Sequence, residues 1–439
     1  MTAALAAWLV VEILMLVVAP ALGHDEAQYA VAARGDRQWL YASIGTAKIG
    51  QIGIALGGGD VAMRVAPGIL SLGFVLACCW VGRIAFDARV GAWAAAAIVG
   101  AHPVALRSTE LLSDLPSAAC LLFGIGMLVR ELSRDDGPSW WVVAVAPAFA
   151  AAFYIRYGHA PVIALAALAA AVLWWRAVVA RPVRVAVTLL AFIVMLVPHA
   201  AYARHETGSV FGILMLGEAL PATTRVAGGL IDYATSNPFV MYGAVIAPLV
   251  VAGLIALVRP PARWRPSILF GVIALGQFVI VGVTGTAQPR YVCVAVALLV
   301  AMAIDGILRL WPGKRIQRIG LGVFAAAWLS VAIVAIPVNR GHARLRAPLV
   351  AAAHAIAADS AGKPCLITGI EVTLLVWQTG CRDLLPLAPY EPGPPDELHY
   401  VVSQDARPID VHAIEAARHE TALVVRVAAA SVHVWRLAP

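Results

Sequence analysis

The sequence is poor in charge and above all in lysine. Charged residues make up 13% of the 439 positions, whereas an ordinary soluble domain carries about 25%. Only three lysines occur, Lys48, Lys314 and Lys363. Hydrophobic residues make up 61% of the chain. This shortage of charge excludes an ordinary soluble globular protein and predicts a protein that spans a membrane several times.

Segments of alternating hydrophobicity are also missing. The apolar runs are long and continuous, which predicts membrane helices rather than a membrane barrel. The net charge of +7 comes mainly from arginines between apolar runs, so the positive-inside rule explains it and no nucleic acid partner is expected. Residues 1–22 lack a basic start and contain Glu12, so we expect a retained first helix rather than a cleaved signal peptide.

About eleven apolar runs are candidate membrane helices. They cover Ala3–Leu22, Met63–Phe86, Val90–Leu106, Asp114–Val129, Trp140–Tyr154, Ala160–Trp175, Val185–Ala203, Phe239–Val258, Ser267–Thr284, Tyr291–Leu308 and Leu321–Val338. Arginine-rich loops alternate with arginine-poor loops, and the rich set is expected in the cytoplasm. The poor set and the tail from Asn339 are then extracytoplasmic.

The chain changes character at Asn339. Arg344–Asp359 predicts an amphipathic helix. Short strands are predicted at Cys365–Thr368, Tyr400–Ser403, Ala422–Val427 and Val432–Leu437. We therefore expect a transmembrane domain at 1–338 and a small extracytoplasmic α/β domain at 339–439. Cys365 and Cys381 could pair outside the cytoplasm, although their spacing alone does not decide it.

The densest polar chemistry beside an apolar run lies between Gly23 and Lys48. It contains His24, Asp25, Glu26, Tyr29 and Lys48. Carboxylates near hydrocarbon are costly, so the acidic pair predicts a functional site. A solvated loop cap is the alternative interpretation. On a helix, Asp25 and Glu26 would point about 100° apart and should have different roles.

Further polar residues stand at predicted helix ends on the same outer side. Asp114 precedes Pro116. It could face the same aqueous cavity as Asp25, or its negative charge could simply interact favourably with the helix dipole. Arg156 and Arg290 also lie at outer helix ends, where a guanidinium suits a phosphate group. Anchoring of arginine and tyrosine, including Tyr291, at the membrane interface is the alternative.

All the histidines fall on the predicted outer side. Among them, His24, His102 and His159 could hold a divalent metal together with Asp25 or Glu26. No HxxxH or HExxH spacing supports such a site. Histidines that simply favour polar interfaces are the alternative.

Three short motifs resemble those of the GT-C membrane glycosyltransferases. Asp25-Glu26 followed by Tyr29 is similar to the DE-x-x-Y stretch of the first external loop, Asp114-Leu115-Pro116 to a later D-x-P, and Arg290-Tyr291 to a late RY motif. Aminoarabinose transferases and protein O-mannosyltransferases are the most similar in arrangement. The family often has a K-P-P-L-like segment, whereas Ile49 and Gly50 follow Lys48 here.

The resemblance implies inverting transfer of a sugar from a polyprenyl-phosphate carrier to a glycan, lipid or protein acceptor. The reaction would occur at the outer face of a bacterial inner membrane. It implies Asp25 as general base, and Lys48, Arg290 and Arg156 as cations that stabilise the leaving phosphate. Glu26 or Asp114 would hold the acceptor or a metal, although no cofactor is required. A transporter or flippase of a lipid-linked sugar and a membrane scaffold for the tail domain are the alternatives.

Overall fold

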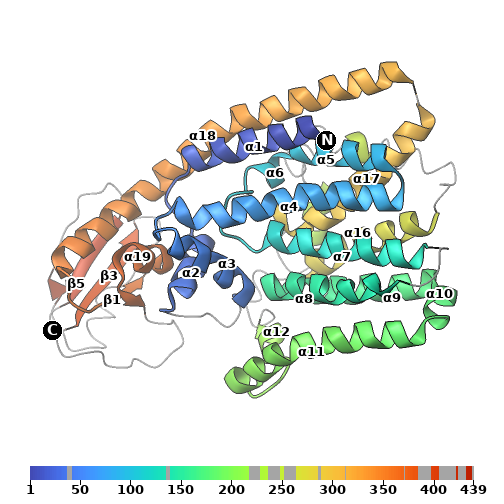
Figure 1. Cartoon of the computed structure of the whole chain (residues 1–439). Helices are drawn as coiled ribbons and strands as arrows, with labels where there is room; N and C mark the ends of the chain where they lie inside the picture. The colour runs from blue at the N-terminus through green and yellow to red at the C-terminus, as the bar shows by residue number, and fades with distance from the viewer. Residues whose placement is uncertain are drawn as a thin grey trace. The chain divides into compact units, whose positions relative to one another are not determined.

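The computed structural model describes most of the chain (Figure 1). The described residues are 1–36, 42–134, 139–216, 228–235, 248–251, 264–284, 288–311, 313–369, 371–383, 397–404, 422–423 and 432–437. They form two compact units. Unit 1 contains Met1–Val17, Ser43–Thr46 and Arg64–Ala335, and unit 2 contains Val18–Ala42, Ala47–Met63 and Ile336–Pro439.

Unit 1 is a bundle of apolar helices. These are α1 (Thr2–Val17), most of α4 (Ala62–Ala85), α5 (Ala88–Val99), α6 (His102–Ala105), α7 (Asp114–Leu132), η1 (Trp140–Ala144), α8 (Val145–Ile155), η2 (Tyr157–His159), α9 (Ala160–Leu173), α10 (Trp175–Val179), α11 (Pro182–Thr207), α12 (Gly212–Leu216), α13 (Gly228–Thr235), α16 (Trp264–Thr284), η5 (Pro289–Val292) and α17 (Cys293–Leu310). Helix α8 packs against α7 and α11, and α17 packs against α5 and α16. Close approach of α4 and α5 requires a glycine, because a Cβ on Gly91 would lie 2.3 Å from the carbonyl oxygen of Cys79.

The helices confirm the prediction of a polytopic membrane protein. Within the described residues, six helices are long and apolar enough to cross a membrane, and four shorter apolar helices accompany them. The predicted span Phe239–Val258 lies mostly outside the described residues. The predicted number of eleven spans therefore stays a prediction.

Unit 2 combines four helical segments with a mixed sheet. Its helices are α2 (His24–Arg34), α3 (Ile44–Ala55, which begins in unit 1), α19 (Val372–Thr379) and the end of α18 (Lys314–Ser360). The strands β1 (Cys365–Gly369), β2 (Arg382–Asp383), β3 (Leu398–Gln404), β4 (Ala422–Leu423) and β5 (Val432–Leu437) are arranged in the order β2-β1-β3-β5-β4. Strand β1 is parallel to β2 and β3, while β5 is antiparallel to β3 and β4.

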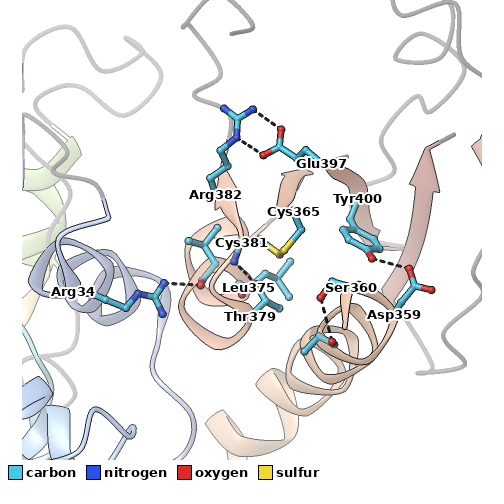
Figure 2. Close-up of a disulfide and its surroundings, with 12 residues drawn as sticks. Arg34, Asp359, Ser360, Cys365, Leu375, Thr379, Cys381, Arg382, Glu397 and Tyr400 are labelled. Atoms are coloured by element: carbon cyan, nitrogen blue, oxygen red, sulfur yellow. Dashed lines mark hydrogen bonds and ion pairs between the residues drawn. A yellow bond between two sulfur atoms is a disulfide. The ribbon is translucent and has the colours of Figure 1, made fainter. Parts of the chain in front are cut away.

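The tail differs from the sequence-based expectations in one feature, and in a second feature it settles a question that the sequence left open. Leu321–Val338 and Arg344–Asp359 were expected as separate helices, but α18 is one helix of 47 residues. The residues at 339–343 contain a single glycine, whose cost of about 1 kcal/mol does not stop a helix that propagates cooperatively. Cys365 and Cys381, whose pairing the spacing left open, form a disulfide (Figure 2).

Candidate functional site

The N-terminus of α2 is fixed by Glu26. Its Oε2 accepts a hydrogen bond of 2.8 Å from the backbone N–H of Gly23, and the residue is 2% exposed. Arg346 lies 3.7 Å from the same oxygen and donates to the carbonyl of Ala21. A Cβ on Gly23 would lie 2.7 Å from the Arg346 guanidinium, so the glycine makes room for it. Glu26 therefore caps α2 and pairs with Arg346, which is a structural role.

Asp25 precedes Glu26 in the first turn of α2. It is half-buried, as is Tyr29. Residues four apart lie on the same face of a helix, so Asp25 and Tyr29 share a face that differs from that of Glu26. Lys48 lies on α3 with an exposed side chain, and its Nζ donates to Gln51 Oε1 at 3.3 Å.

His24, the first residue of α2, contacts the tail of the chain. Its Nδ1 lies 3.2 Å from Glu371 Oε2 and 3.0 Å from Thr373 Oγ1. The hydrogen bond to the Glu371 carboxylate raises the pKa of His24 above its usual value, partly offset by burial. The carboxylate of Asp25 acts in the same direction.

We expect His24→Gln to weaken the pH dependence of stability. A raised pKa means that protonated His24 stabilises the fold fully below its unfolded pKa of about 6.5. That contribution is lost as the pH rises through the folded pKa, so the wild-type unfolding temperature should fall more between pH 6 and 8 than that of the variant. The difference should be small because the His24 side chain is 50% exposed. Thermal unfolding in detergent measures it, and identical pH profiles would contradict the assignment.

A second group of side chains lies in unit 1, and we call it the cation cluster: Asp114, Arg156, Arg290 and Tyr291. Arg156 donates to the Asp114 carboxylate, and Arg290 Nε lies 3.8 Å from its other oxygen. The Arg156 guanidinium lies 4.5 Å from the centre of the Tyr291 ring. Two arginines against one carboxylate leave a net positive charge, which favours an anion.

Helix ends position the cation cluster. Asp114 is the first residue of α7, and Arg156 directly follows α8. The η5 turn that carries Arg290 is fixed by Gln277 of α16, which is fully buried. Gln277 Nε2 donates to the carbonyl of Tyr291 at 3.0 Å, and its Oε1 accepts from Ala295 N at 2.7 Å. Sequence reasoning missed Gln277, although a lone amide within an apolar span is a signal in itself.

We expect Asp114→Asn to destabilise the protein strongly. The Asp114 side chain is 6% exposed and its partner Arg156 is 20% exposed, and loss of one partner of a buried pair costs about 3–5 kcal/mol. The matched control is Asp36→Asn, which removes an ion pair between the 41% exposed Asp36 side chain and Arg34 and should cost less than about 1 kcal/mol. Equal unfolding temperatures of the two variants would contradict this.

The histidines proposed for a metal have separate surroundings. His102 Nε2 lies 2.8 Å from Ser330 Oγ, and His159 is buried in η2. Both belong to unit 1, whereas His24 belongs to unit 2. Within the part of the chain that the structure describes, no three His, Cys, Asp or Glu side chains group closely enough to hold a metal.

Comparisons with known proteins agree with this architecture. Residues 43–202 match the family of dolichyl-phosphate-mannose-protein mannosyltransferases, a segment that includes Lys48, Asp114 and Arg156. No curated protein sequence matches the chain.

Two solved structures share the fold. ArnT from Cupriavidus metallidurans bound to undecaprenyl phosphate has a TM-score of 0.72 at 16% identity, covering 99% of this chain and 97% of that one. Archaeal oligosaccharyltransferase AglB from Archaeoglobus fulgidus, in complex with an inhibitory peptide and a dolichol-phosphate, has a TM-score of 0.52 at 12% identity. That match covers 87% of this chain and 64% of AglB. The resemblance to GT-C membrane glycosyltransferases is thus confirmed at the level of the fold, and the chain is a polytopic membrane protein that shares the fold of ArnT and AglB.

Proposed function

We propose that the protein is a glycosyltransferase that moves a sugar from a polyprenyl-phosphate carrier to an acceptor hydroxyl. The observation that carries the proposal is the cation cluster, where Arg156 and Arg290 outnumber the single carboxylate of Asp114. A net positive site at helix ends suits the phosphate of a lipid carrier. The polyprenyl phosphates bound to ArnT and AglB, which share this fold, support the choice of donor.

The chemistry follows from these side chains. Asp25 takes the proton of the acceptor hydroxyl while the acceptor oxygen bonds to the anomeric carbon of the sugar. The bond between that carbon and the phosphate oxygen breaks, and its electron pair leaves with the polyprenyl phosphate. Arg290, Arg156 and Lys48 stabilise the charge on the leaving group. A single displacement of this kind inverts the anomeric configuration.

Tyr29 and Tyr291 are proposed as substrate-binding residues. Glu26 is instead occupied with the cap of α2, so we assign it no part in the transfer. Because cations already stabilise the phosphate, the reaction as proposed needs no metal.

The reaction is proposed for the extracytoplasmic face of a bacterial inner membrane. The disulfide between Cys365 and Cys381 supports this location, because disulfides persist in oxidising compartments outside the cytoplasm. The arginine-poor loops that carry Asp114 and Arg156 support the same side. The acceptor is a glycan, a lipid or a protein.

Proteoliposomes distinguish transfer from transport. A polyprenyl-phosphate monosaccharide, labelled in the sugar, is supplied with a mixture of lipid and glycan acceptors. A transferase produces free polyprenyl phosphate and labelled acceptor. Movement of intact labelled donor between leaflets without either product would contradict the proposal and favour a flippase.

A further inference from the structure

Helix α19 holds α2 at both ends. At its start, Glu371 and Thr373 contact His24, the first residue of α2. At the other end, Arg34 donates two hydrogen bonds of 3.0 Å to the carbonyls of Val376 and Trp377, which lie near the end of α19. Figure 2 shows Arg34 reaching α19 from α2. These contacts hold both ends of α2 against α19.

The sheet in turn holds α19. Cys365 in β1 and Cys381, two residues after the end of α19, are joined by the disulfide across a separation of 16 residues. The backbone N–H of Cys381 donates to Thr379 Oγ1 at 3.2 Å, and Thr379 Oγ1 donates to the carbonyl of Leu375 at 2.7 Å. Figure 2 shows the disulfide beside these contacts. The disulfide therefore ties the C-terminal end of α19 to strand β1 of the sheet.

Glu371 adopts a backbone conformation that is unusual for its residue type. Its φ is 47°, in the left-handed region, which costs free energy for any residue with a Cβ. It stands at the N-cap of α19, yet its side chain makes no cap hydrogen bond to that helix. The carboxylate instead reaches His24. The unusual backbone conformation thus coincides with a side-chain contact between two helices. This makes Glu371 a candidate functional residue.

We propose that α19 is the positioning element for the catalytic base and that Glu371 is its contact residue. The proposal rests on the proposed function, in which Asp25 is that base. Asp25 follows His24 directly and lies in the first turn of α2, so a contact that holds His24 also acts on the backbone of Asp25. A shift of 1 Å at a reacting group can cost about 100-fold in rate. Glu371 acts through His24 and is a positioning residue, not a catalytic one.

The test measures the position of α2 independently of activity. In the full-length protein in lipid and detergent, Glu371→Ala should speed amide hydrogen exchange in residues 24–34 by about tenfold. Turnover with a polyprenyl-phosphate sugar should show kcat lower by about 10- to 100-fold, with KM for the donor changed by less than about twofold. Glu371→Gln keeps a hydrogen-bonding group opposite His24 and should recover most of kcat.

Two further variants test whether the effect is specific to the contact between α19 and α2. Asp359→Asn removes a part-exposed carboxylate from an ion pair with Arg436, elsewhere in the same unit, and should leave α2 exchange and kcat unchanged. The double variant Cys365→Ser, Cys381→Ser should behave as Glu371→Ala does. Unchanged α2 exchange in Glu371→Ala, or faster exchange with an unchanged kcat, would overturn the proposal. If the wild type transferred no sugar, the proposed function would fail, while the exchange data would still decide whether α19 holds α2.

Discussion

Asp25→Asn is expected to lower sugar transfer by about 100- to 10,000-fold, the range over which a general base contributes. Asparagine has nearly the same shape as aspartate but cannot take the proton of the acceptor hydroxyl. Donor binding should persist, because Asp25 belongs to neither the cap of α2 nor the cation cluster. Turnover of a labelled donor and equilibrium binding of the same donor measure the two effects separately.

The control for this prediction is Asp36→Asn. Asp36 lies just beyond α2, is 41% exposed and pairs with Arg34, so its loss should change turnover little. Unfolding temperatures must be similar for both variants and the wild type, so that a lost fold is not mistaken for lost chemistry. Transfer by Asp25→Asn at the wild-type rate would show that Asp25 is not the base.

Arg290→Gln is expected to lower kcat/KM for the donor by about 10- to 100-fold, since hydrogen bonds to charged groups contribute about 1.5–3 kcal/mol. Arg290 lies 3.8 Å from Asp114, whereas Arg156 is bonded to that carboxylate directly. Arg290 is therefore the arginine better placed to turn towards a phosphate. Binding of free polyprenyl phosphate should weaken in the same variant, because the lost charge acts on the phosphate itself.

Arg309→Gln is the matched control for Arg290. Arg309 stands at the opposite end of α17 and pairs with Asp305 at 2.6 Å, so the variant removes one arginine from the same segment. Its kcat/KM and phosphate binding should stay close to those of the wild type. Equal losses in both variants would indicate a general effect of net charge rather than a phosphate site.

Much of unit 1 could be predicted because hydrophobicity alone determines where membrane helices lie. The predicted span Met63–Phe86 corresponds to α4 at Ala62–Ala85, and Asp114–Val129 to α7 at Asp114–Leu132. The cation cluster was predicted only as separate residues. Asp114 and Arg156 are 42 positions apart, and side-chain pairs of such separation depend on helix packing that sequence patterns do not reveal.

The surroundings of α2 were harder to predict. A glutamate three residues after the N-cap can cap a helix. Because residues 23–48 were interpreted as a candidate site, Glu26 was predicted to hold the acceptor or a metal rather than to cap α2. The link from His24 to Glu371 spans 347 positions, and the left-handed conformation of Glu371 has no signal in the sequence. The domain boundary between residues 338 and 339 stays a prediction, and unit 2 contains Val18–Ala42 besides the tail.

The most direct test of the central claim compares wild type and Asp25→Asn on a panel of radiolabelled polyprenyl-phosphate monosaccharides. Purified protein in lipid and detergent is given each donor together with mixed acceptors, and free polyprenyl phosphate and labelled acceptor are quantified. We predict that the wild type forms the two products in equal amounts from at least one donor and that Asp25→Asn binds this donor without turnover. Binding without turnover by both proteins, or equal turnover by both, would contradict the account.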